Sequence, residues 1–201
     1  MLVSYPTVMG YPPVLSRGLT LIELLIVLTL STVVLAIAAP AMGHWVRDIE
    51  VRSSASALLA TLHAARAEAV TRNASVQLQL TDAQGRPAWQ LGCTQPTARC
   101  PTLIRQQATD QGTSVRWGAA VLTAMPSIST AITAGNGLPA GIRFDSTGAA
   151  AEIATGADLA RVDITYNNEP DTRRLVVLIS TQGMARICDP SASTAHPTSC
   201  D

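Results

Sequence analysis

The sequence predicts an α+β protein in which a long N-terminal helix packs on an antiparallel β-sandwich. Two changes of pattern along the 201-residue chain support this fold. An apolar run ends at Pro40, and apolar residues then recur every three or four positions as far as Arg72, which is the period of an amphipathic helix. Beyond Asn73, apolar and polar residues alternate in short segments between turns, as in half-buried strands.

The apolar run contains one carboxylate, Glu23, within the sequence RGLTLIELLIVL at positions 17–28. About 18 helical residues at 1.5 Å each span roughly 27 Å, which is close to the thickness of the hydrocarbon core of a bilayer. A charged group at that depth costs about 2.5–3.5 kcal/mol. If the run crosses a membrane, a partner charge must offset this cost.

Residues 1–40 have three interpretations. Ala36-Ile37-Ala38 has the small-x-small form of a secretory signal cleavage site. Alternatively, the run is a plain signal anchor in which Glu23 has no explained role. In the third interpretation the chain is cut after Gly18, and the new ammonium at Leu19 pairs with a glutamate of the same or a neighbouring subunit.

The third interpretation is favoured because residues 18–28 resemble the type IV prepilin signature, which is a Gly before the cut, a hydrophobic residue, Thr-Leu-Ile-Glu and an apolar helix. The resemblance implies that a prepilin peptidase removes the leader, residues 1–18, and that Leu19 becomes the N-methylated terminus. It also implies that residues 19–40 form a helix that spans the inner membrane and later packs in a filament core. In such a filament, Glu23 guides the subunit into place. Pro40 lies where many pilins have a helix-kinking proline.

Residues 41–72 are predicted to continue the helix with an apolar stripe. Leu58, Leu62, Ala65 and Ala69 recur at spacings of four, three and four, so they share one face of a helix. This stripe is expected to cover a sheet of the following head, residues 73–201. The strands expected in the head are residues 76–81, 88–91, 103–107, 114–117, 128–133, 141–145, 149–153, 161–166, 175–180 and 184–188.

Three segments resemble the FimT/GspH family of minor pilins and pseudopilins. They are the helical segment LLATLHAARAEAVTRN at 58–73, the strand and turn GIRFDSTG at 141–148, and the hairpin LVVLISTQGMAR at 175–186. The resemblance implies a type IV pilin-like fold. It also implies a minor pilin that initiates or caps a type IV pilus, with two alternatives: a pseudopilin of a type II secretion system, or a DNA-binding minor pilin for natural transformation.

The four cysteines, Cys93, Cys100, Cys188 and Cys200, permit three pairings. The short pairings 93–100 and 188–200 are the simplest, because each closes within one local excursion and stabilises the fold by about 3 kcal/mol. A zinc site is the alternative, but no C-x-x-C occurs and His196 is the one nearby imidazole. Disulfides indicate an oxidising compartment, and we expect the head to lie in the periplasm.

No motif indicates catalysis, a metal or a cofactor, and a formal net charge of zero argues against general binding to polyanions. DNA binding enters through the resemblance, since DNA-binding relatives carry a G-R-x-R motif near the C-terminus. The matching residues here are Gly183-Met184-Ala185-Arg186, in which Met184 replaces the first Arg. Arg173 and Arg174 lie close enough along the chain to compensate for that loss.

The partners implied by the resemblance are a prepilin peptidase, other major and minor pilins or pseudopilins, and an inner-membrane assembly platform. We therefore expect a single-pass protein of the inner membrane that moves into a pilus or pseudopilus. The sequence leaves open which of the two machines it serves and where in the filament it lies.

Overall fold

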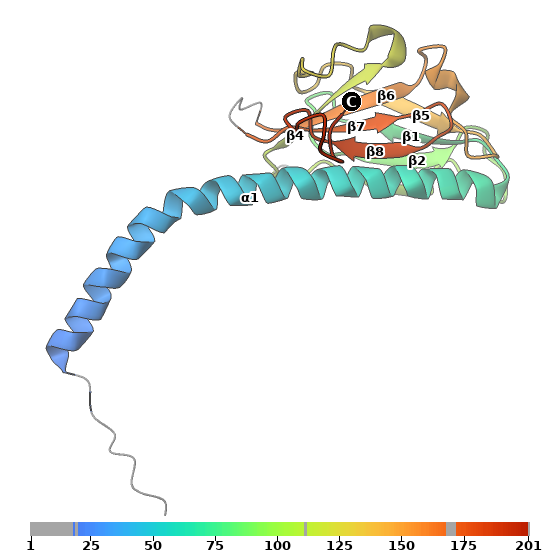
Figure 1. Ribbon diagram of the computed structural model, residues 1–201. Coiled ribbons are helices and arrows are strands. Elements are labelled where there is room, and N and C mark those ends of the chain that lie inside the picture. Colours follow the sequence, from blue (N-terminus) through green and yellow to red (C-terminus); the bar gives the residue numbers. More distant parts are fainter. Residues whose placement is uncertain (1–17, 19, 111, 168–171, 201) are drawn as a thin grey trace, which may run out of the picture. The chain divides into compact units, whose positions relative to one another are not determined.

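The computed structural model describes residues 18, 20–110, 112–167 and 172–200 (Figure 1). The chain forms two compact units, Met1–Met42 and Gly43–Asp201. The helix α1 (Leu21–Arg72) supplies the apolar segment of the first unit and one layer of the second. It ends where Asn73 adopts a positive φ of 49°, a backbone conformation that asparagine tolerates at the end of a helix.

In the first unit, the large apolar side chains of α1 from Leu21 to Ile37 are 52–78% exposed. No described part of this unit covers them, so their surface is available to a membrane or to other helices. Within the described residues no single helix is long and apolar enough to cross a membrane. The bent pair of helical segments Leu21–Ile37 and Met42–Arg72 is, by length and composition, sufficient to cross one. The backbone at Pro40 is part of α1, but its side chain lies outside the described set.

The second unit contains two four-stranded antiparallel sheets (Figure 1). The first sheet has the order β3-β2-β1-β5, and the second has the order β4-β6-β7-β8. In the second sheet β6 pairs with β7 and β7 with β8, which gives a meander of three consecutive strands, and β4 pairs with the free side of β6. The strands are β1 (Val76–Leu80), β2 (Trp89–Cys93), β3 (Arg105–Gln107), β4 (Val115–Val121), β5 (Ala140–Phe144), β6 (Leu159–Tyr166), β7 (Leu175–Ile179) and β8 (Ala185–Cys188).

One continuous apolar core joins α1 to both sheets. On β1 the alternation predicted from the sequence is present, since Val76, Leu78 and Leu80 are buried while the glutamines between them are half-buried. The predicted helical stripe of Leu58, Leu62, Ala65 and Ala69 is buried as well, and the structure extends it to Val51 and Ala55, with no residue more than 2% exposed. The neighbouring Leu59 is half-buried.

Two of the expected strands are wrong. Residues 128–133 belong to the long loop between β4 and β5, which also contains the short 3₁₀ helix η1 (Leu122–Ala124), and several carbonyls of this loop accept hydrogen bonds from arginines instead of from a neighbouring strand. Residues 149–150 have no regular secondary structure, and the 3₁₀ helix η2 (Ala151–Ile153) follows them. The second error has a local cause, because Ala and Glu favour helical over extended backbone.

Both short-range disulfides favoured by the sequence are present. Cys93–Cys100 closes the excursion after β2, and Cys188–Cys200 ties the C-terminal tail to β8. The first loop is also held by the end of α1, because the Arg72 guanidinium donates to the carbonyl of Arg99 at 2.6 Å.

The buried stripe predicts a contrast between two truncations on α1. Leu62→Ala should lower the free energy of unfolding by about 2–5 kcal/mol, because it leaves a cavity between helix and sheets. Val70→Ala, at a position that is 50% exposed, should change it by less than about 0.5 kcal/mol. Urea unfolding of the full chain in detergent, followed by indole fluorescence, measures both, and equal losses would contradict the assignment of the stripe.

Candidate functional site

The first turn of α1 holds the residues around the expected cleavage position. Gly18 is exposed, and a Cβ placed on it would meet no atom within 4 Å, while Leu19 lies outside the described residues. Thr20 caps the helix: its hydroxyl accepts the Glu23 N–H at 3.3 Å and its carbonyl accepts the Leu24 N–H at 3.1 Å. With Glu23 three positions after Thr20, this turn has the pattern of a capping box.

The side chain of Glu23 differs from the other polar side chains of this apolar segment. The hydroxyls of Thr29, Ser31 and Thr32 each donate to a carbonyl three or four residues earlier, at 2.7–2.9 Å. These hydroxyls are therefore satisfied without water. Within the described residues the Glu23 carboxylate has no such internal partner. In an apolar environment an unpaired carboxylate is costly, and a cation from outside this segment would lower that cost.

The three family-like segments meet in the second unit at Arg66. The Arg66 Nε donates to the carbonyl of Gly148 at 3.0 Å, and its Nη1 lies 2.9 Å from the sulfur of Met184. Gly183 and Gly148 have φ of 75° and 82°, and a Cβ on Gly183 would collide with the carbonyl of Gly148. Arg66 thus joins α1 to the β5–β6 and β7–β8 turns, a role that the sequence did not suggest.

Two of the three arginines proposed for DNA contacts hold the C-terminal tail. Arg173 donates to Asp189 at 2.8 and 3.0 Å, and Arg186 donates to the carbonyls of Ser199 and Cys200 at 3.4 and 3.1 Å. Burial raises the pKa of Asp189, but the hydrogen bonds from Ser191 and Arg173 outweigh this effect and lower the pKa below its ordinary value. Asp189 is therefore a stable anion between β8 and the tail.

The third arginine, Arg174, belongs to a buried ionic network. Its Nη1 lies 2.7 Å from Asp163 Oδ2, and Arg161 contacts the same carboxylate at 2.6 and 2.9 Å. The side chains of Arg161 and Asp163 are fully buried. Because no charge here is left without a partner of opposite sign, the network avoids the large penalty of an isolated buried ion.

The network fixes the loop between β4 and β5. Arg161 donates to the carbonyls of Pro126, Ser127 and Thr130, at 2.8–3.1 Å. Arg174 donates to the carbonyl of Ile128 at 2.7 Å. The loop covers the outer face of β6, which is why residues Leu159 to Ile164 are buried on both faces of the strand.

One sequence signal could have revealed this network. Arg161 and Asp163 are two residues apart on a predicted strand, so their opposite charges lie on one face of an otherwise apolar segment.

All three arginines proposed for DNA contacts, Arg173, Arg174 and Arg186, donate to acceptors within the protein, which a phosphate would have to displace. DNA binding through these arginines stays a prediction.

Within the part of the chain that the structure describes, no group of three or more His, Cys, Asp or Glu side chains is placed to hold a metal ion. All four cysteines are in disulfides, so they are unavailable as thiolate ligands.

Two family models match the chain. Residues 54–183 match the model described as Type II transport protein GspH, and residues 15–39 match the prokaryotic N-terminal methylation motif. No curated protein sequence matches. The two models follow one another in the order that the sequence predicts, with a processing motif before a pilin-like head.

Solved structures of two proteins are similar to this one. The type IV minor pilin FimU of Pseudomonas aeruginosa is 21% identical, with 76% of this chain and 96% of that chain covered and a TM-score of 0.45. The minor pseudopilin EpsH from the type II secretion system of Vibrio cholerae is 11% identical, with 71% of this chain and 99% of that chain covered and a TM-score of 0.47.

The buried network predicts a large effect of a small change. Asp163→Asn removes the one carboxylate with which Arg161 and Arg174 both pair and should destabilise the fold by about 3–5 kcal/mol in urea unfolding. Glu152→Gln is the matched control, because its exposed pair with Arg143 has a separation of 3.5 Å and should contribute less than about 1 kcal/mol. A loss at Asp163 no greater than that of the control would show that the loop is held by other contacts.

Proposed function

The chain belongs to the family described as type II transport protein GspH, and on that premise we propose that it is a minor pilin that helps to initiate or cap a type IV pilus. The observation that carries the proposal is the overlap of the methylation-motif match, residues 15–39, with an uncovered apolar helix. In that helix Glu23 is a carboxylate with no internal partner among the described residues. The apolar side chains of such a helix are removed from water only in a membrane or among other helices, and a neighbouring helix can also supply a partner for the carboxylate.

Assembly follows from the chemistry of the first turn. A prepilin peptidase cuts between Gly18 and Leu19, and the new terminus is methylated. The ammonium of Leu19 then lies one residue before the Thr20 cap. Because Glu23 is in the first turn of the same helix, its carboxylate can pair with such an ammonium, its own or that of an adjacent subunit. Pairing between subunits fixes their stagger while the apolar surfaces of the helices pack together.

The location of each part follows from this role. The helix spans the inner membrane once, and an assembly platform then transfers the subunit from the membrane into the filament. The head with its two disulfides lies in the periplasm, where such bonds persist. The protein is a substrate of the peptidase, and its own role is assembly rather than catalysis.

A pseudopilin of a type II secretion system is the second candidate, because the description of the matched family model names type II transport. The two candidates share processing and assembly but differ in their neighbours. Deletion of the gene separates them, since loss of surface pili with normal secretion supports a pilus subunit, and the reverse supports a pseudopilin.

Processing and the role of Glu23 give one joint prediction. N-terminal sequencing of the mature protein should begin at a methylated Leu19, whereas a start at Ala39 would indicate a secretory signal peptide. Glu23→Ala should still be cleaved but should enter filaments at least about ten-fold less well, because the terminal ammonium loses its partner. Glu152→Ala, which removes an exposed carboxylate of the head, should assemble normally, and equal incorporation of both variants would refute the pairing.

A further inference from the structure

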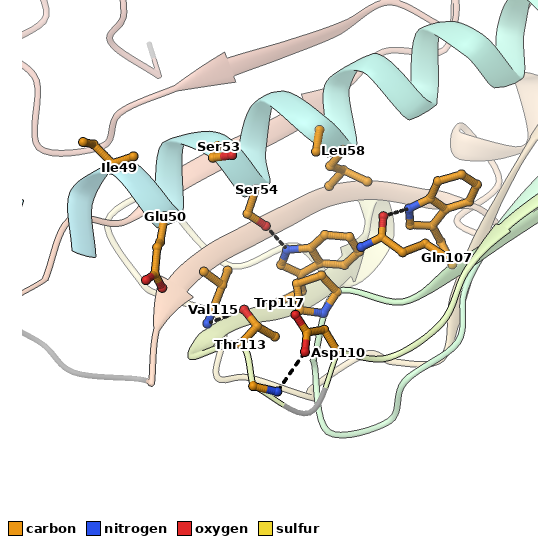
Figure 2. Close-up of a pocket in the computed structure, with 14 residues that line it drawn as sticks. Ile49, Glu50, Ser53, Ser54, Leu58, Gln107, Asp110, Thr113, Val115 and Trp117 are labelled. Carbon is orange, nitrogen blue, oxygen red and sulfur yellow. Dashed lines mark hydrogen bonds between the residues drawn. The ribbon is translucent and has the colours of Figure 1, made fainter. Parts of the chain in front are cut away.

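A groove of about 490 Å³ lies between α1 and the strands at one edge of each sheet. The edge strand β3 of the first sheet and the edge strand β4 of the second border it, and α1 crosses above it in Figure 2. We call it the Trp groove. Its principal lining residues are Glu50, Ser54, Leu58, Trp89, Asp110 and Trp117.

Neither indole of the Trp groove has its N–H group available to a ligand. The Trp117 N–H donates to the hydroxyl of Ser54 at 3.0 Å, and the Trp89 N–H donates to the side-chain carbonyl of Gln107 at 3.2 Å. Since both N–H groups already donate to acceptors within the protein, neither is free to donate to a ligand. The aromatic surface that a ligand can reach is the half-buried ring of Trp89, because Trp117 is only 2% exposed and forms the floor behind it.

The charges that line the Trp groove are all negative. Glu50 is half-buried and projects from α1 on the side of the groove where Val115 lies (Figure 2). Among the described residues no cation or hydrogen-bond donor pairs with its carboxylate. Asp110, on the loop after β3, accepts one hydrogen bond, from the N–H of Gly112 at 2.9 Å. No Arg or His side chain within the described residues lines the groove.

These features select among ligand classes. An anion would meet only like charge, and a purely apolar group would desolvate Glu50 without pairing it. An ammonium can also lie over an indole, but it is more strongly hydrated and has no planar fork of donors, so it fits the site less well. A guanidinium is planar and weakly hydrated, stacks on aromatic rings and donates in a fork to carboxylates, so it can contact the Trp89 ring and pair with an acid at the same time.

We propose that the Trp groove binds an arginine side chain of a neighbouring pilin-like subunit. This inference rests on the proposed function, because assembly brings other heads against this one. It adds a specific contact between heads to the packing of the helices, and it assigns Glu50 as the charged anchor of that contact. All fourteen basic residues of this chain are arginine, so a second copy carries the required chemistry as well.

The two groove tryptophans provide the readout. In the full chain in detergent, Trp45→Phe leaves Trp89 and Trp117 as the remaining indoles. Titration with Nα-acetyl-arginine amide should change their fluorescence saturably, and Nα-acetyl-citrulline amide, which has the same shape without the charge, should bind at least ten-fold more weakly. Equal responses to the two probes, or no response to arginine, would overturn the proposal.

Matched variants locate the effect. Glu50→Gln should reduce the arginine response to the citrulline level, whereas Asp48→Asn, which removes a carboxylate of α1 that does not line the groove, should leave it unchanged. If circular dichroism shows that Glu50→Gln does not fold, Asp110→Asn on the exposed loop replaces it and should weaken binding at least three-fold. Equal binding by the substituted and control chains would overturn the assignment of the acids.

The same preparations are assayed for cleavage after Gly18 by a prepilin peptidase. Failure of cleavage with intact arginine binding would refute the proposed function and leave the groove as a site for a cationic ligand. Normal cleavage with no arginine binding would refute the contact between heads and leave the filament role in place.

Discussion

The second unit depends on one face of α1 being buried against both sheets. The stripe from Val51 to Ala69 contributes to the same core as β1, β5, β6 and β7. Three of its six residues are alanine, which lets the helix backbone lie close to the strands. Without this face, the side chains of the sheets that pack on α1 would be exposed to water. The helix is therefore part of the fold of the head as well as its connection to the apolar segment.

The sequence was sufficient for features that depend on the pattern of nearby residues. The spacing of Leu58 and Leu62 placed the buried face of α1 correctly, and the alternation at residues 76–80 placed β1. The pairing of Cys188 with Cys200 was also favoured, because short loops close most simply. In each of these cases the physical cause lies within about a dozen residues of the effect.

The features that the sequence did not reveal have causes that are distant along the chain. Residues 128–133 are rich in the β-branched residues typical of strands, but carbonyls of this segment accept hydrogen bonds from the guanidiniums of Arg161 and Arg174, more than 30 positions away. These guanidiniums in turn are balanced by Asp163, whose burial comes from the same loop. Charge alone suggested a surface role for Arg174, whereas its environment makes it internal. Local periodicity cannot report such an arrangement, because each part is stable only when the others are present.

The position of the disulfides has a mechanical consequence. All four cysteines are used in two local bridges, one beside β2 and one beside β8, and neither bridge links α1 to a strand. A force that pulls on the N-terminal end of α1 therefore acts first on the apolar contacts and the few hydrogen bonds between helix and sheets, such as those of Ser54 and Arg66, and only then on the backbone that leads from Arg72 to β1. These contacts are spread over more than four turns of the helix and would be sheared in parallel rather than opened one at a time. Under tension, resistance to separation of α1 from the sheets would thus be set by the length of the buried stripe, and the disulfides would protect only the two loops that they close.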